Sequence, residues 1–210
     1  MSLGEKKSIF YFNEEGKKNT EKVLNLVLER ANTLNINKVL IFTSNGDTAL
    51  KLRNRNEEID IIAVSFPYNQ ELMVNNNEGE KQKIMPKTSD LEVHKELVEN
   101  DIKLLQGTMP FKDIVIPGTR DTKKATIYHT LSLISGGLSF CVQSVIMATD
   151  RGLVNNDEEV IAMSADTAIV ATGANTQWIF HPSKGMEIKE IICKPQKLSF
   201  THEEKKEREE

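Results

Sequence analysis

Two short apolar runs, close together in the sequence, constrain the fold of this chain more than any other feature. They are residues 38–43 (KVLIFT) and 59–64 (IDIIAV). An apolar run without polar alternation predicts a strand that is covered on both faces, as in parallel sheets. A short helix is expected between the two runs, at about residues 47–55. A strand, a helix and a strand in this order predict a right-handed βαβ unit with parallel strands.

The rest of the chain alternates in the same way between helical and strand patterns. Residues 20–34 carry apolar side chains at helical spacing, and the capping box Ser89-Asp90-Leu91-Glu92 predicts the start of a helix that runs to about residue 100. Further elements are expected as helices at 122–134 and 138–149, and as strands at 103–106, 159–163, 167–172 and 186–193, the last stopped by Pro195. The alternation predicts a three-layer α/β/α sandwich around a mostly parallel mixed sheet.

This sandwich is expected to be a single domain that spans residues 9–197. Residues 1–8 are expected to form a flexible start, in which Met1-Ser2-Leu3 looks like a remnant of expression cloning, and residues 198–210 a charged flexible tail. Residues 67–87 are polar and show little periodicity, which predicts a connection without regular structure. Such a connection is either a lid or binding loop, or simply disordered.

Composition and charge exclude several classes of function. The chain of 210 residues has 27 basic and 31 acidic side chains and a net charge of -4, so no positive field favours nucleic acid. No apolar run approaches the roughly 20 residues that a bilayer requires, which predicts a protein without a membrane span. Cys141 and Cys193 both lie inside apolar runs. They are expected to be buried packing thiols of a reducing compartment, which favours the cytoplasm.

The polar turn that follows the first apolar run is the most informative candidate site. It consists of Thr43, Ser44, Asn45, Gly46, Asp47 and Thr48. A turn between a buried strand and a helix directs backbone N–H groups and polar side chains into one concavity, which suits an anion or a phosphate. The alternative is that Asn45-Gly46 only forms a tight turn and that Asp47 or Thr48 only caps the helix.

Two further segments are expected near this turn. Asn19 and Thr20 begin the first long helix, and its N-terminus is expected at the carboxyl edge of the sheet, so that both polar segments face one ligand. Thr119 and Arg120 follow the Pro117-Gly118 turn. Arg120 is the cation best placed to pair with a phosphate, although an exposed arginine without a ligand is the alternative.

Other chemistries find no support in the sequence. The four histidines show no spacing that is typical of metal ligands, so no metal site is predicted. Walker, Gly-x-Gly-x-x-Gly and Gly-x-Ser-x-Gly motifs are absent, and no nucleophile can be named. The sequence therefore singles out no catalytic residue.

Several segments together resemble the carboxy-terminal domain of pyruvate kinase. They are KVLIFTSNGDTALKLRNR, IDIIAVS, DTAIVATG and MEIKEIICKP. The segments GKKNTEKVL, SNGDTA, VIMATDRG and KEIICKP are more closely similar to a stand-alone prokaryotic family of pyruvate kinase alpha/beta domain proteins. The resemblance covers about residues 9–195 and implies the fold of that domain, a three-layer sandwich whose last strand is antiparallel.

The resemblance also implies a function. It implies no pyruvate kinase activity, because the catalytic β/α barrel of roughly 250 residues does not fit in this chain. Some full-length relatives bind a sugar bisphosphate at the turn that matches residues 43–48, but Asp47 stands where they commonly have arginine. The stand-alone family implies binding of flavin mononucleotide (FMN). The expectation is thus a phosphate-containing small-molecule ligand, with a flavin-dependent oxidoreductase or a regulatory subunit that senses a sugar phosphate as alternatives, and a homodimer as the oligomeric state.

Overall fold

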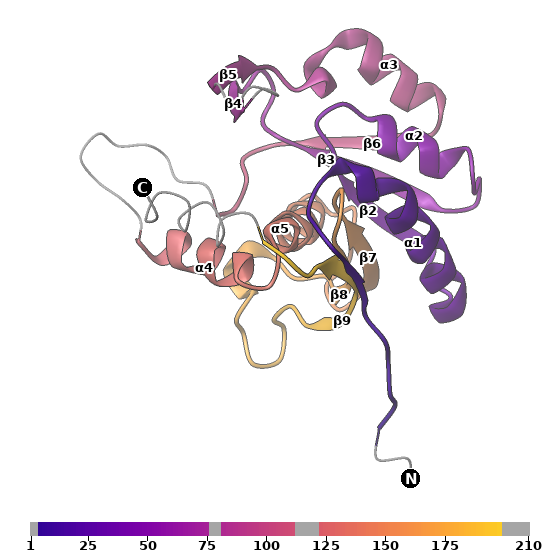
Figure 1. Cartoon of the computed structure of the whole chain (residues 1–210), viewed down its shortest axis with the longest axis vertical. Helices are drawn as coiled ribbons and strands as arrows, with labels where there is room; N and C mark the ends of the chain where they lie inside the picture. Colours follow the sequence, from indigo (N-terminus) through magenta and orange to yellow (C-terminus); the bar gives the residue numbers. More distant parts are fainter. Residues whose placement is uncertain (1–3, 76–80, 112–121, 199–210) are drawn as a thin grey trace.

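A seven-stranded sheet forms the centre of the molecule. The computed structural model describes residues 4–75, 81–111 and 122–198. In sheet order the strands are β1 (Phe10–Phe12), β9 (Ile188–Pro195), β8 (Ala168–Thr172), β7 (Glu159–Met163), β2 (Lys38–Phe42), β3 (Asp60–Ser65) and β6 (Ile102–Gln106). Helices cover both faces of this sheet (Figure 1). The predicted α/β/α sandwich with a mostly parallel mixed sheet is confirmed.

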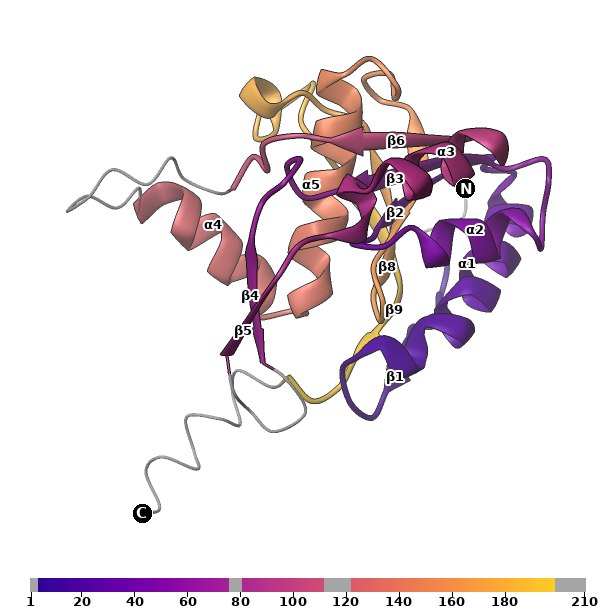
Figure 2. The same cartoon turned by 90° about the horizontal axis from the view of Figure 1, so that it is seen from above.

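The helices divide into two layers. One layer holds α1 (Thr20–Leu34), α2 (Asp47–Arg53) and α3 (Leu91–Glu99), and the other holds α5 (Gly136–Asp150), with α4 (Thr122–Ser132) packed on it. Short 3₁₀ turns lie at Lys17–Asn19, Lys87–Ser89 and Thr176–Trp178. Figure 2 shows the strands between the two layers. Within the described residues, no helix is long and apolar enough to cross a membrane.

The βαβ unit at the centre of the sheet is as the sequence predicts. β2 and β3 pair in parallel, with Leu40 opposite Ile62. Val39 and Ile61 belong to the core beneath α1, α2 and α3, whereas Leu40 and Ile62 belong to the core beneath α5. Both runs are continuously apolar because helices cover both faces of the strands.

The reversed strand is β8, not the last strand of the chain. β8 pairs antiparallel with both β7 and β9, so β9 runs in the same direction as β7, and β1 runs parallel to β9. Only residues 164–167 connect β7 to β8, and the Ser164 N–H donates to the Thr167 carbonyl at 2.8 Å. So short a connection can only return the chain antiparallel. Pro195 also lies inside β9 rather than beyond it, opposite Phe12 of β1.

The prediction that residues 67–87 lack regular structure is wrong for the residues described. β4 (Leu72–Asn75) and β5 (Lys81–Ile84) pair antiparallel, with Leu72 opposite Ile84. This ribbon stands away from the seven-stranded sheet (Figures 1 and 2). Backbone pairing holds it, and the β5 side chains are exposed. The residues of β5, Lys81–Ile84, show no hydrophobic alternation, which is why the sequence pattern missed the ribbon.

The capping box predicted at Ser89 does not form. Asp90 is the N-cap of α3 and makes no side-chain capping bond. Ser89 instead lies in a 3₁₀ turn, where its hydroxyl accepts a hydrogen bond from the Asn69 N–H at 3.0 Å. A tertiary hydrogen bond with Asn69, in the segment that precedes β4, therefore replaces the local capping bond.

Candidate ligand-binding site

A cleft of about 1000 Å³ lies at the carboxyl edge of the sheet, between the ends of β2 and β7. From β2 the chain passes to β3 on one side, whereas β7 lies on the other side of β2. Such a reversal of strand order is a topological switch point, where ligands of open α/β sheets bind. Residues 43–45, 47 and 48 line one wall, and residues 164–166 line the opposite wall.

The polar turn after β2 uses three of its backbone donors within itself. Thr43 Oγ1 accepts hydrogen bonds from the N–H groups of Gly46 at 3.0 Å and of Asn45 at 3.4 Å. Asn45 Oδ1 accepts from the Asp47 N–H at 3.3 Å. These three donors of the backbone cradle expected for a phosphate are therefore occupied by the turn's own side chains. Among the side chains of the turn, the hydroxyls of Ser44 and Thr48 line the cleft without a hydrogen-bond partner among the described residues.

Two of the predicted site residues do not line the cleft. Gly46 has φ of 83°, a conformation that favours glycine, and a Cβ there would lie 3.4 Å from side-chain atoms of Val93 and Leu97 on α3. Asn19 is buried, and its Nδ2 donates to the Glu14 carbonyl at 2.7 Å. Both residues shape neighbouring backbone. The alternative of a side-chain cap at Asp47 or Thr48 is also wrong, because Gly46 is the N-cap of α2 and no side chain caps it.

Thr20 lies in the cleft, as predicted, together with the segment that precedes it. Thr20 Oγ1 donates to the Ala165 carbonyl at 3.2 Å, which ties the start of α1 to the turn after β7. Lys17 also lines the cleft and forms no ion pair among the described residues, whereas Lys51 on α2 is paired with Glu21 at 2.7 Å. Lys17 is therefore the cation available to an anionic ligand. Thr119 and Arg120 lie outside the described residues.

Asp166 is a carboxylate that the sequence did not single out. It is 8% exposed, its Oδ2 accepts from the Gly16 N–H at 2.8 Å, and its Oδ1 accepts from the Thr167 hydroxyl at 3.0 Å. Burial raises the pKa of Asp166 above its ordinary value, with a smaller contribution from Glu15, and these two hydrogen bonds oppose the rise. The folded protein thus holds this proton more tightly than the unfolded chain does.

We expect Asp166→Asn to change how stability depends on pH. A raised folded pKa means that wild-type stability declines as pH rises from about 3.8, the ordinary value, through the folded pKa. The asparagine variant lacks this loss, so its free energy of unfolding should increase relative to that of the wild type as the pH rises across that interval. Urea unfolding of both proteins between pH 4 and 7 measures the difference. A constant difference across this range would show that folding does not raise the pKa of Asp166.

The opposite end of the cleft is aromatic. The rings of Phe42 and Phe140 stack with centroids 4.5 Å apart, and Phe66 meets Phe42 edge-on at 5.0 Å. Tyr128 and His129 of α4 complete this end. A second cavity of about 570 Å³ adjoins it, and Phe66, Tyr128, His129 and Phe140 line both spaces. The sequence reasoning missed this end because these aromatic residues lie on four separate segments of the chain.

The start of α5 contributes Gly136 and Gly137 to the lining of the cleft. Ser135 is the N-cap, its Oγ accepts from the Gly137 N–H at 3.1 Å, and it lies 2.5 Å from Thr167 Oγ1. A Cβ on Gly137 would lie 2.4 Å from Ser164 Oγ and 2.8 Å from Thr167 Cβ. Gly137 therefore permits α5 to approach the turn after β7. In the sequence these glycines indicated only the gap between two helices.

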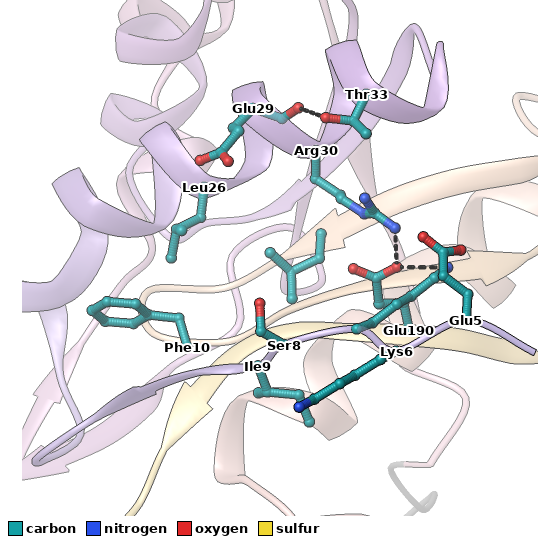
Figure 3. A pocket seen from close by; sticks show the side chains of 12 residues that line it. Glu5, Lys6, Ser8, Ile9, Phe10, Leu26, Glu29, Arg30, Thr33 and Glu190 are labelled. Atoms are coloured by element: carbon teal, nitrogen blue, oxygen red, sulfur yellow. Dashed lines mark hydrogen bonds and ion pairs between the residues drawn. The ribbon is translucent and has the colours of Figure 1, made fainter.

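Another cavity, of about 470 Å³, lies on the far side of α1, beneath the N-terminal segment (Figure 3). Its buried carboxylate, Glu190, pairs with Arg30 Nη2 at 2.6 Å and with Lys7 Nζ at 3.1 Å. These ion pairs join α1 to β9 and to the N-terminal segment. The arrangement is that of a structural ion pair, and it gives less support to a ligand site than the cleft does.

Nucleophilic and metal chemistry find little material among residues 4–75, 81–111 and 122–198. Cys141 and Cys193 are buried free thiols, as predicted. Burial raises the pKa of Cys193 to about 12 and that of Cys141 further, so both stay protonated. No group of three or more His, Cys, Asp or Glu side chains in these ranges is placed to hold a metal ion.

Residues 21–180 match the family described as pyruvate kinase, alpha/beta domain. Among solved structures, pyruvate kinase from Cryptosporidium parvum is 14% identical over 75% of this chain and 22% of its own, with a TM-score of 0.36. The same organism's pyruvate kinase in complex with ADP is 14% identical over 82% of this chain and 23% of its own, with a TM-score of 0.34. The family match covers most of the chain, which therefore belongs to the pyruvate kinase alpha/beta domain family.

Proposed function

We propose that this protein binds a small molecule that carries a phosphate group, and that this ligand is FMN. The proposal rests on the division of the switch-point cleft into a polar end and an aromatic end. A ligand with a planar ring, a hydroxylated chain and a terminal phosphate matches both ends. Membership of the family accounts for the fold of the domain, and the proposal includes no phosphoryl transfer.

The polar end supplies donors for the phosphate. Lys17 is an unpaired cation at this end, and the hydroxyls of Ser44 and Thr48 face the same space without other partners among the described residues. Hydrogen bonds to a charged acceptor are stronger than those between neutral groups. Asp47 and Asp166 repel a phosphate but accept hydrogen bonds well. They suit the hydroxyl groups of the ribityl chain, so the phosphate is expected beside Lys17 and Ser44.

The aromatic end supplies apolar surface for the ring. Phe66, Tyr128 and Phe140 offer ring faces and edges, and planar ligands stack favourably on such surfaces. When bound, a flavin supplies hydride-transfer chemistry. The described residues of the cleft would bind and orient it.

The test is titration of the purified protein with FMN and with riboflavin, with inorganic phosphate as a competitor. Flavin fluorescence reports the binding. We expect Ser44→Ala to weaken FMN binding by about 0.5 to 3 kcal/mol, or roughly 2- to 150-fold, because one hydrogen bond to the phosphate is lost. Riboflavin lacks the phosphate, so its affinity should be the same for wild type and variant. Inorganic phosphate should compete with FMN.

The matched control is Ser8→Ala, which removes an exposed hydroxyl on the far side of α1 and should leave all three affinities unchanged. Melting temperatures establish that both variants are folded. Absence of FMN binding by the wild type would overturn the proposal. Equal affinities for FMN and riboflavin, with no effect of Ser44→Ala, would show that the phosphate does not bind at this end of the cleft.

The cellular and oligomeric expectations accompany this proposal. We propose a cytoplasmic protein, on the basis of its two buried thiols, and a homodimer, on the basis of the family resemblance.

A further inference from the structure

Among the described residues, two buried side-chain atoms lack a hydrogen-bond partner: Arg30 Nε and Gln70 Oε1. Arg30 already pairs with Glu190 through Nη2. Gln70 makes no side-chain hydrogen bond with any described residue, and its amide lines the second cavity, next to the cleft. A buried acceptor without a donor costs free energy, so its presence in a cavity wall points to a missing donor.

The position of Gln70 is held by backbone contacts. The Gln70 N–H donates to the Pro67 carbonyl at 3.1 Å, and the preceding residue, Asn69, adopts a positive φ of 56°. The Asn69 N–H is bound by Ser89 Oγ at 3.0 Å, and the neighbouring Thr88 N–H donates to the Ser44 carbonyl at 3.1 Å. Asn69 and Gln70, which precede β4, are therefore linked through residues 88 and 89 to the polar turn.

The other amide in this cavity is fully engaged. Gln143 is 1% exposed, its Oε1 accepts from the Phe111 N–H at 2.9 Å, and its Nε2 donates to the Ser139 carbonyl at 3.2 Å. The remaining lining is mostly apolar and aromatic, including Met73, Met109 and Phe111. Gln70 is thus the amide in this cavity that remains open to a ligand.

We infer that the second cavity is the ring subsite of the ligand whose phosphate lies at residues 43–48, and that Gln70 Oε1 accepts a hydrogen bond from an N–H at the edge of a planar heteroaromatic ring. The inference rests on the proposed function, because Phe66, Tyr128 and Phe140 line both the cavity and the cleft, so the two spaces adjoin. In an oxidised flavin the ring N–H is that of N3. Gln70 therefore selects rings that present such a donor.

The experiment uses lumiflavin, which has the ring without the ribityl phosphate, and 3-methyllumiflavin, in which a methyl group replaces the N3 proton. Gln70→Met keeps the length of the side chain and removes the acceptor. We expect Gln70→Met to weaken the binding of lumiflavin and FMN roughly 2- to 10-fold. The wild type should bind 3-methyllumiflavin more weakly than lumiflavin, and Gln70→Met should leave the affinity for 3-methyllumiflavin unchanged. Gln82→Met, on the exposed strand of the same ribbon, is the control and should change nothing.

Thermal unfolding provides a second readout. Because Gln70 Oε1 satisfies no other group in the ligand-free protein, Gln70→Met should not lower the melting temperature. A marked fall would mean that the amide has a structural partner, and it would overturn the inference.

The outcomes separate this inference from the proposed function. If FMN binds and Gln70→Met has no effect on any probe, the ring subsite is wrong and the proposed function stands. If FMN does not bind but lumiflavin does, and its affinity depends on Gln70, the ring subsite stands and the phosphate ligand is wrong. If neither compound binds, both are wrong.

Discussion

Replacing Gly137 with alanine is expected to lower the free energy of unfolding by about 1 to 3 kcal/mol, the cost of overpacking a close contact. The new Cβ would lie 2.4 Å from Ser164 Oγ and 2.8 Å from Thr167 Cβ. A serine hydroxyl can rotate away, but the Cβ of Thr167 is attached to the backbone and is 1% exposed. The turn after β7 or the start of α5 must therefore move.

The same movement should weaken ligand binding, because Ser164 and Asp166 in that turn line the cleft together with Gly137. Chemical unfolding gives the loss of stability, and FMN titration at a temperature where the variant is folded gives the loss of affinity. An affinity equal to that of the wild type would show that the ligand does not depend on this wall.

Gly136→Ala is the matched control, because it makes the same change one residue earlier in the same helix. A Cβ there would have an ordinary contact, 3.5 Å from Glu15 Oε1. Alanine is favoured over glycine in helices by up to about 1 kcal/mol, so this variant should be as stable as the wild type or more stable. Equal stability of the two variants would contradict the close packing inferred at Gly137.

Tyr128→Ala is expected to produce the largest loss of affinity. Tyr128 lines both the cleft and the second cavity, so its ring is placed at their junction. Stacking of a planar ring on an aromatic side chain contributes about 1 to 3 kcal/mol, which corresponds to roughly 5- to 150-fold. FMN, riboflavin and lumiflavin share the ring, so all three should lose affinity by a similar factor.

Tyr68→Ala is the control for this prediction. Tyr68 is 59% exposed and lines neither cavity, so its removal should leave the affinities unchanged. Far-ultraviolet circular dichroism establishes that Tyr128→Ala keeps the helix content of the wild type. A loss confined to FMN would place the phosphate rather than the ring beside Tyr128 and would contradict the proposed orientation.

The main elements of the sheet could be predicted because buried elements show a characteristic pattern of apolar residues in the sequence. β2 and β3 read as uninterrupted apolar runs, since both of their faces are covered. The helix over residues 20–34 was predicted with the same bounds as α1, because one apolar face is repeated over 15 residues.

The elements that were not predicted show no such pattern of apolar residues. β1 has only three residues, too few for any periodicity, and its place beside β9 depends on a long-range backbone pairing. In the ribbon, the side chains of β5 are all exposed. The direction of β8 depends on the length of the turn at residues 164–167, and the resemblance assigned the reversed direction to the wrong strand.

The polar turn of the candidate site followed from the sequence alone, for a local reason: a polar turn directly after a buried strand must lie at the carboxyl edge of a parallel sheet. The sequence by itself thus determined the α/β class, the central strands and the place of residues 43–48. Only the tertiary structure decided which groups share the cleft with that turn, namely Asp166, Gly137, Tyr128 and the adjoining Gln70. These residues come from distant segments, and their proximity depends on the packing of α4, α5 and the ribbon against the sheet, which no local pattern encodes.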